Sequence, residues 1–249
     1  MSAGAPAVWP EDVRVRASEA DAAGLLSPRA LCDWLQEAAG NHATALGWAV
    51  DQLAGRGLTW VLSRLHLRVT RYPAWRESVR VETWPAGAER LYAVREFRLT
   101  GTDEEELAVA TSGWLLVDLA SRRPQRPPAE IHEMARNTPA RVIPDRFERL
   151  GEVAASDGSE SFTARASEVD LNGHVNNVAL IAWVLDSAPH EHLETHRLAE
   201  LEVEFRAESR QGDRVVSRWA TDGATRLHAV TREADGRELL RARTVWAPR

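Results

Sequence analysis

Two stretches of this sequence match each other in register: Arg16–Ala39, RASEADAAGLLSPRALCDWLQEAA, and Arg165–Ala188, RASEVDLNGHVNNVALIAWVLDSA. Ten of the 24 positions are identical, at a constant offset of 149 residues. Self-similarity of this kind decides the architecture before any single motif is considered, because each copy must form a similar structural unit. The sequence therefore predicts two copies of one fold in a chain of 249 residues.

Each copy is expected to begin as a short strand and to continue into a helix. The strands are predicted at Val13–Ser18 and Phe162–Ser167, and an Asp-x-x-Gly turn separates each strand from an apolar segment with helical spacing. Trp34 and Trp183 occupy equivalent places in the two helices. In the second copy one helix face is predicted to carry the apolar residues Val178, Ile181, Leu185 and Ala188.

Beyond the helix, both copies alternate apolar and polar residues with a period of two, as half-buried strands do. Leu65–Trp84 resembles Leu201–Trp219, and each half ends on a strand with a late tryptophan, Trp114 or Trp246. A long helix packed on a curved antiparallel sheet, present as two tandem repeats, is an α+β arrangement. This arrangement is that of a double hotdog.

The segment between the two copies differs in composition from both. Residues 119–150 carry five Pro and several Arg, which is typical of an exposed connection rather than a core element. We place the domain boundary within it. Residues 1–135 are predicted to be the N-terminal hotdog repeat with the start of the linker, and residues 136–249 the C-terminal repeat.

Composition limits the classes of function. A formal net charge of −6 gives no overall attraction for nucleic acid, and no apolar run approaches the ~20 residues of a membrane span. Cys32 is the single cysteine, so an internal disulfide is excluded. Met1–Pro10 has neither the basic nor the apolar region of a signal peptide, so we expect a cytoplasmic protein.

The two copies differ most in the turn before the helix. Asp21–Pro28 reads DAAGLLSP, whereas Asp170–Asn177 reads DLNGHVNN, and only the second is densely polar. Both copies face the same structural demands, so the extra polarity indicates a functional role. The structural alternative is that the asparagines only cap the helix, which Asn does well; these are Asn172, Asn176 and Asn177.

The segment DLNGHVNN, followed by a helix containing Trp183, resembles the signature of the plant and bacterial acyl-acyl carrier protein (acyl-ACP) thioesterases. Tyr72–Trp75, Val81–Trp84 and Trp183–Pro189 are also similar to segments of that family, and the resemblance covers about residues 11–247 in order. In the family, the catalytic residues come from this signature and from a Glu on the following strand. The resemblance implies a catalytic set of Asp170, Asn172, His174 and Glu208.

One position departs from the family pattern. The family often has a Cys after the catalytic Glu, in a segment of the form Arg-x-Glu-Cys, and this chain has Ser209. The remaining cysteine, Cys32, aligns with Ile181 of the second copy and is expected to pack in the core. A cysteine nucleophile is therefore excluded.

Thioester hydrolysis needs an activated water or a carboxylate nucleophile, and donors directed at the developing oxyanion. Glu208 and Asp170 are the candidates for general base or nucleophile, and which of them attacks is left open. Asn172 can orient a water or a carboxylate, and His174 can carry a proton near neutral pH. The N-terminal turn of a helix that begins near Val175 can polarise the carbonyl group.

Together with these candidate residues, the resemblance implies hydrolysis of fatty acyl-ACP, or of acyl-CoA, to release free fatty acid, and we expect no cofactor, metal or nucleic acid. Two alternatives are kept. One is a non-catalytic or regulatory protein that binds acyl thioesters, and the other is a hotdog hydratase or dehydratase, which the Asp-x-Asn-x-His spacing disfavours. The choice between monomer and homodimer is left open.

Two further groups of residues have both a functional and a structural interpretation. His192 and His196, four residues apart, have a spacing that can bind zinc, but no partner motif accompanies them and we favour a polar surface turn. Six arginines either lie on the solvated surface or bind the carrier and its phosphates. They are Arg122, Arg123, Arg126, Arg206, Arg210 and Arg214.

Overall fold

A computed structural model of the chain describes residues 5–249, so the first four residues of the opening segment lie outside the described part. The chain divides into two compact units, one ending at Phe147 and the other running from Glu148 to Arg249. Within residues 5–249, no helix is both long enough and apolar enough to cross a membrane. The boundary that we placed at residue 135 stays a prediction.

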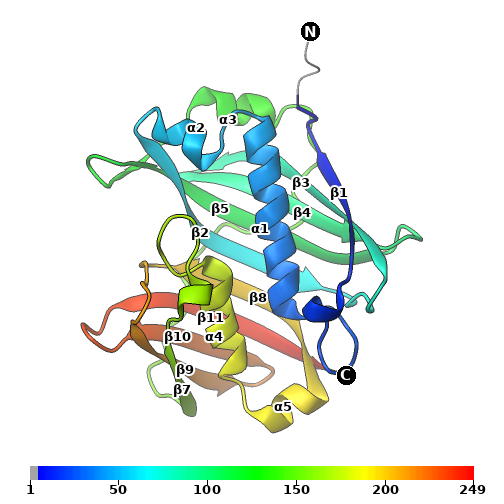
Figure 1. Ribbon diagram of the computed structural model, residues 1–249, viewed down its shortest axis with the longest axis vertical. Coiled ribbons are helices and arrows are strands. Elements are labelled where there is room, and N and C mark those ends of the chain that lie inside the picture. Colours follow the sequence, from blue (N-terminus) through cyan, green and yellow to red (C-terminus); the bar gives the residue numbers. More distant parts are fainter. Residues whose placement is uncertain (1–4) are drawn as a thin grey trace. The chain divides into compact units, whose positions relative to one another are not determined.

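The first unit is an antiparallel sheet with one long helix. Its strands are β1 (Trp9–Arg14), β2 (Leu58–Val69), β3 (Ser78–Glu89), β4 (Tyr92–Thr100), β5 (Glu106–Asp118) and β6 (Pro124–Gln125). Its helices are α1 (Pro28–Ala45), α2 (Val50–Ala54) and α3 (Ala129–Met134). The five main strands lie in the order β1-β3-β4-β5-β2, and α1 lies across them (Figure 1). Leu31, Leu35, Ala38 and His42 form the buried stripe of α1.

The second unit repeats this plan. Its strands are β7 (Gly158–Thr163), β8 (His196–Phe205), β9 (Arg214–Asp222), β10 (Thr225–Arg232) and β11 (Glu238–Pro248). Its helices are α4 (Asn177–Asp186) and α5 (His190–Thr195). The strand order is β7-β9-β10-β11-β8, which is the order of the first unit with each strand replaced by its counterpart. The predicted pair of α+β repeats, each with a helix on an antiparallel sheet, is confirmed.

The two predicted strands that open the copies end earlier than expected. β1 ends at Arg14 and β7 at Thr163, each four residues before the predicted end, and a short 3-10 helix follows in both units. In the first unit the Glu19 carboxylate accepts the backbone N–H of Arg16 at 2.8 Å, and the second unit repeats this contact. This local hydrogen bond favours a turn over continued strand pairing.

The central helix of the second unit is shorter than its counterpart, with 10 residues against 18. All of its residues from Val178 to Leu185 are buried. The helix is therefore buried around its whole circumference and not only on the expected apolar face. Ala188 is also buried but lies beyond the end of the helix, which corrects its predicted place on the helix. The chain cannot continue as a helix into Pro189, because the residue before a proline is disfavoured in the helical region.

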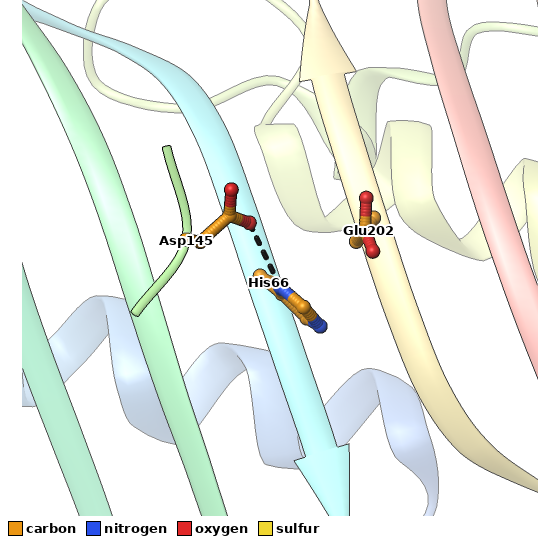
Figure 2. Close-up of side chains that lie close together, drawn as sticks. All are labelled: His66, Asp145 and Glu202. Atoms are coloured by element: carbon orange, nitrogen blue, oxygen red, sulfur yellow. Dashed lines mark hydrogen bonds and ion pairs between the residues drawn. The ribbon is translucent and has the colours of Figure 1, made fainter. Parts of the chain in front are cut away.

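The connection between the copies is only partly exposed, which corrects the expectation for residues 119–150. Three apolar side chains of this segment are buried: Ile131, Ile143 and Phe147. Arg141 donates from Nε to the buried carboxylate of Glu96 at 3.0 Å. Asp145 bonds Nδ1 of His66 on β2 at 2.8 Å, as Figure 2 shows. The composition of residues 119–150 indicates only that the segment is polar on average. It does not show which single apolar and charged residues attach the segment to the sheet.

Candidate active site

The polar turn of the second unit is closed by its own backbone. The N–H of Asp170 donates to the carbonyl of His174 at 2.9 Å, and the N–H of Gly173 donates to the carbonyl of Asp170 at 3.0 Å. The Asp170 carboxylate accepts the N–H of Asn172 at 2.8 Å, which makes an Asx turn. Gly173 has φ +75°, a conformation that favours glycine. The turn is therefore fixed by the Asp and Gly of the motif.

The first unit contains the same turn without the other polar side chains. Asp21 N–H donates to the carbonyl of Leu25 at 2.7 Å, and the Asp21 carboxylate accepts the N–H of Ala23 at 2.9 Å. Gly24 also has φ +75°. Backbone geometry therefore accounts for the Asp and the Gly in both copies. It does not account for the Asn and His side chains that follow Asp170.

The capping alternative is correct for one of the asparagines. Asn176 is the N-cap of α4, and its side-chain oxygen accepts the N–H of Val178 at 2.7 Å. Ser27 does the same for α1. The helix therefore begins at Asn177, two residues later than predicted, because Val175 instead donates its N–H to the carbonyl of Ser209 at 2.8 Å.

His174 and Glu208 meet through side-chain atoms. Nε2 of His174 lies 3.2 Å from Oε2 of Glu208, with 26% of the histidine side chain and 51% of the glutamate side chain exposed. Glu208 was expected on the strand after the helix, but β8 ends at Phe205 and Glu208 lies in the following loop. In this loop about half of the Glu208 side chain is exposed to solvent.

Asn172 lies with the other carboxylate. Its Nδ2 is 3.5 Å from Oδ2 of Asp170, and its side chain is exposed whereas Asp170 is half-buried. The structure thus brings the four predicted residues together as two pairs, Asp170 with Asn172 and His174 with Glu208. The backbone bond from Asp170 to the carbonyl of His174 joins the two pairs.

Neither sulfur chemistry nor a serine nucleophile fits this geometry. Ser209 is fully buried and donates from Oγ to Asp213 at 3.0 Å, so it faces away from its exposed neighbour Glu208. Cys32 is buried in α1 of the first unit, and burial together with the nearby charge of Asp33 raises the pKa of its thiol to about 12. The burial of Cys32 agrees with the exclusion of a cysteine nucleophile.

The corresponding place in the first unit is apolar. Leu26 donates its N–H to the carbonyl of Pro73 at 2.9 Å, the equivalent of the bond between Val175 and Ser209. Tyr72, which is buried, therefore stands where Glu208 stands in the second unit, and Leu25 stands where His174 stands. Of the four polar positions only the aspartate is shared by the two units.

Comparisons with known proteins agree with this pair of units. The model of the acyl-ACP thioesterase N-terminal domain matches residues 6–135, and that of the C-terminal domain matches residues 151–248. This chain belongs to the acyl-ACP thioesterase family. The double hotdog fold is confirmed by the solved acyl-ACP thioesterase of Bacteroides thetaiotaomicron, with a TM-score of 0.87 and 26% identity over 96% of this chain and 98% of that one.

Other relatives of this family member come from plants. The 12:0-ACP thioesterase of Umbellularia californica matches with a TM-score of 0.87 and 28% identity, and 98% of each chain is covered. The chloroplastic palmitoyl-acyl carrier protein thioesterase of Gossypium hirsutum is 29% identical over 97% of this chain. The family member spans 64% of the length of that cotton protein.

In this family member His192 and His196, whose spacing is compatible with zinc binding, stack their rings face to face. The rings of His192 and His196 are stacked with centroids 4.4 Å apart and an interplanar angle of 11°. His192 also meets the edge of Trp246. Burial, followed by the charges of Arg226 and His196, lowers the pKa of His192 below its usual range. In this arrangement the two residues form an aromatic cluster rather than a pair of converging nitrogen ligands.

Two charged residues of the family member contact the loop of Glu208 and were missed from the sequence. Arg232, at the end of β10, donates from Nη1 to the backbone carbonyl of Glu208 at 3.2 Å. Asp213 accepts both the Ser209 hydroxyl and the N–H of Arg210. No sequence signal marks them, because Arg232 lies 24 residues from Glu208 in an ordinary run of charged residues.

Proposed function

We propose that this protein hydrolyses the thioester bond of fatty acyl-ACP and releases a free fatty acid and the thiol of the carrier. The observation that carries the proposal is the contact of His174 with Glu208, beside Asp170 and Asn172, in only one of two otherwise matching turns. Membership of the acyl-ACP thioesterase family supports the same chemistry.

The pair of His174 and Glu208 has the geometry of an acid–base pair. With 3.2 Å between Nε2 and Oε2, the carboxylate orients the imidazole for proton transfer. One route uses this pair to take a proton from water as the water attacks the carbonyl carbon. The proton then passes from the imidazole to the sulfur of the leaving thiolate, so the products are a carboxylic acid and a thiol.

A second route uses Asp170 as the nucleophile. Its carboxylate would form an anhydride with the acyl group and expel the thiol, and water would then hydrolyse the anhydride. Both Asp170 oxygens already face Asn172, Oδ1 through the backbone N–H at 2.8 Å and Oδ2 through the side-chain amide at 3.5 Å. These contacts engage both carboxylate oxygens of Asp170, so this geometry favours the route through Glu208 and His174.

The two routes predict different fates for a heavy-oxygen label in water. Repeated turnover in labelled water should leave the peptide that contains Asp170 unlabelled if water attacks the thioester directly. Heavy oxygen in the Asp170 side chain would instead show that an anhydride forms and that water attacks the carboxyl group of the enzyme. Mass spectrometry of the digested protein detects this label, and an unlabelled peptide excludes attack of water on the Asp170 carboxyl group.

The carrier contacts are proposed to centre on Arg210. Two of the three arginines near the loop already have carboxylate partners, Arg206 with Glu238 at 2.5 Å and Arg214 with Glu233 at 3.1 Å. Arg210 is exposed two residues after Glu208, where a guanidinium suits a phosphate group of the carrier arm. Replacing it should raise KM for the acyl thioester while kcat changes little.

The direct test is turnover by the purified protein on acyl-ACP and acyl-CoA substrates of several chain lengths, followed by release of thiol and of fatty acid. His174→Ala is the matched control. Binding of acyl thioesters without release from any of them would favour the non-catalytic alternative. A cytoplasmic location stays a prediction, to be checked by fractionation, and light scattering distinguishes a monomer from a homodimer.

A further inference from the structure

The loop that carries Glu208 is held by an arginine from another strand. Arg232 is the last residue of β10, and its side chain is 22% exposed. Its Nη1 donates to the backbone carbonyl of Glu208 at 3.2 Å and lies 3.3 Å from Oδ2 of Asp213. Its Nε and Nη2 donate to the two carboxylate oxygens of Asp235 at 3.0 and 2.8 Å. This fork fixes the guanidinium plane in one orientation.

Asp213 accepts hydrogen bonds from the two loop residues that follow Glu208. Its Oδ2 accepts the N–H of Arg210 at 2.9 Å and the hydroxyl of Ser209 at 3.0 Å, in addition to Arg232. Burial alone would raise the pKa of Asp213, but the hydrogen bonds from Arg210, Ser209 and Arg232 outweigh it and lower the pKa below its usual range. The carboxylate is therefore ionised at neutral pH, as the contact with Arg232 requires.

These contacts immobilise three consecutive residues. Glu208 is held at its carbonyl by Arg232, Ser209 at its hydroxyl by Asp213 and at its carbonyl by Val175, and Arg210 at its N–H by Asp213. A loop residue beyond the end of a strand has no ladder of hydrogen bonds to orient it. The fixed backbone supplies that orientation, so the Glu208 carboxylate can approach His174 from one direction.

A comparison with the first unit shows which of these contacts are common to both units. Glu77 accepts the N–H of Ala74 at 2.9 Å, as Asp213 accepts that of Arg210. Its guanidinium partner is Arg71, which bonds Glu77 at 2.9 and 3.1 Å and also bonds Glu105. A carboxylate clamp at this corner is therefore common to both units. In the second unit the guanidinium comes instead from Arg232 of β10, and it also reaches the carbonyl of Glu208.

We propose that Arg232, oriented by Asp213 and Asp235, is a positioning residue that holds Glu208 against His174 for the reaction. This inference rests on the proposed function and deepens it. Arg232 touches no reacting atom. It acts through the backbone of Glu208, so its loss misplaces the carboxylate without removing it.

The experiment compares Arg232→Gln, Arg232→Lys and Glu77→Gln with the wild type in kcat, KM and urea unfolding. Arg232→Gln should lower kcat about 10-fold to 10²-fold with little change in KM, as expected when a catalytic group is displaced by an ångström or less. Arg232→Lys should restore only part of kcat, because an ammonium cannot make the same fork. Glu77→Gln, the matched control, should lower stability and leave kcat close to the wild-type value.

A double-mutant cycle with Glu208→Gln distinguishes positioning from general loss of structure. If Arg232 acts through Glu208, then Arg232→Gln should cause almost no further decrease in kcat once Glu208 is already Gln. Fully additive losses, or an unchanged kcat in Arg232→Gln, would overturn the inference. Should that variant fail to fold, Asp235→Asn serves in its place, since Asp235 is half-exposed and loosens the same fork.

Failure of the inference is distinguishable from failure of the proposed function. A folded wild-type protein without turnover on any acyl thioester contradicts the proposed function and the positioning role that rests on it. An active wild type, with Glu208→Gln inactive and Arg232→Gln as active as the wild type, contradicts the positioning role alone.

Discussion

Val175 donates its backbone N–H to the carbonyl oxygen of Ser209 at 2.8 Å. These two residues directly follow His174 and Glu208, so one backbone hydrogen bond holds together the segments of both proposed acid–base residues. Leu26 and Pro73 make the same bond at 2.9 Å in the first unit. The backbone scaffold of the site and its aspartate are therefore present twice, whereas the Asn, His and Glu side chains are present once.

The asymmetry between the units predicts which substitutions remove activity. His174→Ala or Glu208→Gln should lower kcat by ~10²–10⁴-fold, the usual range for loss of acid–base assistance. Asp21→Asn should change kcat far less, because an Asn oxygen can still accept the backbone N–H of Ala23. Steady-state kinetics with circular dichroism on each variant provides the test. Loss of turnover in Asp21→Asn, with activity retained in His174→Ala, would place the site in the first unit.

Ser209→Ala should keep most of the activity. The serine is fully buried and its hydroxyl bonds Asp213, so it contributes to the loop and not to the chemistry. Losing this hydrogen bond should lower the free energy of unfolding by about 1 kcal/mol, since Asp213 keeps its other donors. Urea unfolding and kcat measure the two effects separately. A stable but inactive Ser209→Ala protein would reopen a serine mechanism.

Gly24 and Gly173 form a matched pair for separating strain from function. Both have φ +75°, and an added Cβ meets no heavy atom within 4 Å at either position. Each Gly→Ala change should therefore cost about 1–2 kcal/mol of stability through the backbone conformation alone. Only Gly173→Ala should lower kcat, because its turn carries Asn172 and His174. Equal losses of kcat in both variants would contradict the assignment.

His42 should make the first unit sensitive to acid. It is fully buried, its Nδ1 accepts from Arg95 at 3.1 Å, and its Nε2 donates to the carbonyl of Pro6 at 3.0 Å. Burial, then the charge of Arg95, lowers the pKa of His42 to about 4 from 6.5. The unfolded state therefore binds more protons between these values, and the stability that the neutral ring contributes declines as the pH falls below about 6.5.

The corresponding measurement is urea unfolding of the wild type and His42→Gln at pH 7 and pH 5. The wild type should lose about 2 kcal/mol more than the variant over this interval, because Gln cannot take up a proton. Other buried histidines, such as His228, titrate in both proteins, so the difference isolates His42. The same pH dependence in both proteins would show that folding does not lower the pKa of His42.

The repeat predicted the fold because the residues that define each copy are structural in both. Glu19 and Glu168 each accept the indole N–H of a helix tryptophan, Trp34 at 3.2 Å and Trp183 at 3.3 Å. Sequence identity at these positions reflects identical contacts. Where such contacts are local, as in the Asx turns, the pattern was sufficient to predict the element.

The parts that the sequence did not predict depend on contacts between distant segments. The place of Glu208 in a loop follows from the end of β8 at Phe205, which no local signal marks. The contact of Arg232 with Glu208 depends on how β10 lies in the sheet, and composition cannot reveal that Ile143 is buried. Charged and apolar residues in irregular segments have no periodicity from which a partner can be inferred.

The Asx turn of the first unit, closed by Asp21 and Gly24, is a backbone on which a second set of the polar side chains could be designed. Its backbone already has the hydrogen bonds of the turn that carries His174, and Leu26 is already joined to Pro73. Introducing Ala23→Asn, Leu25→His and Tyr72→Glu would transplant the polar set onto it. The buried Tyr72 position is the main obstacle, because a carboxylate there must be desolvated. A variant with one such site in each unit would be obtained only if the loop around Pro73 were first made accessible to solvent.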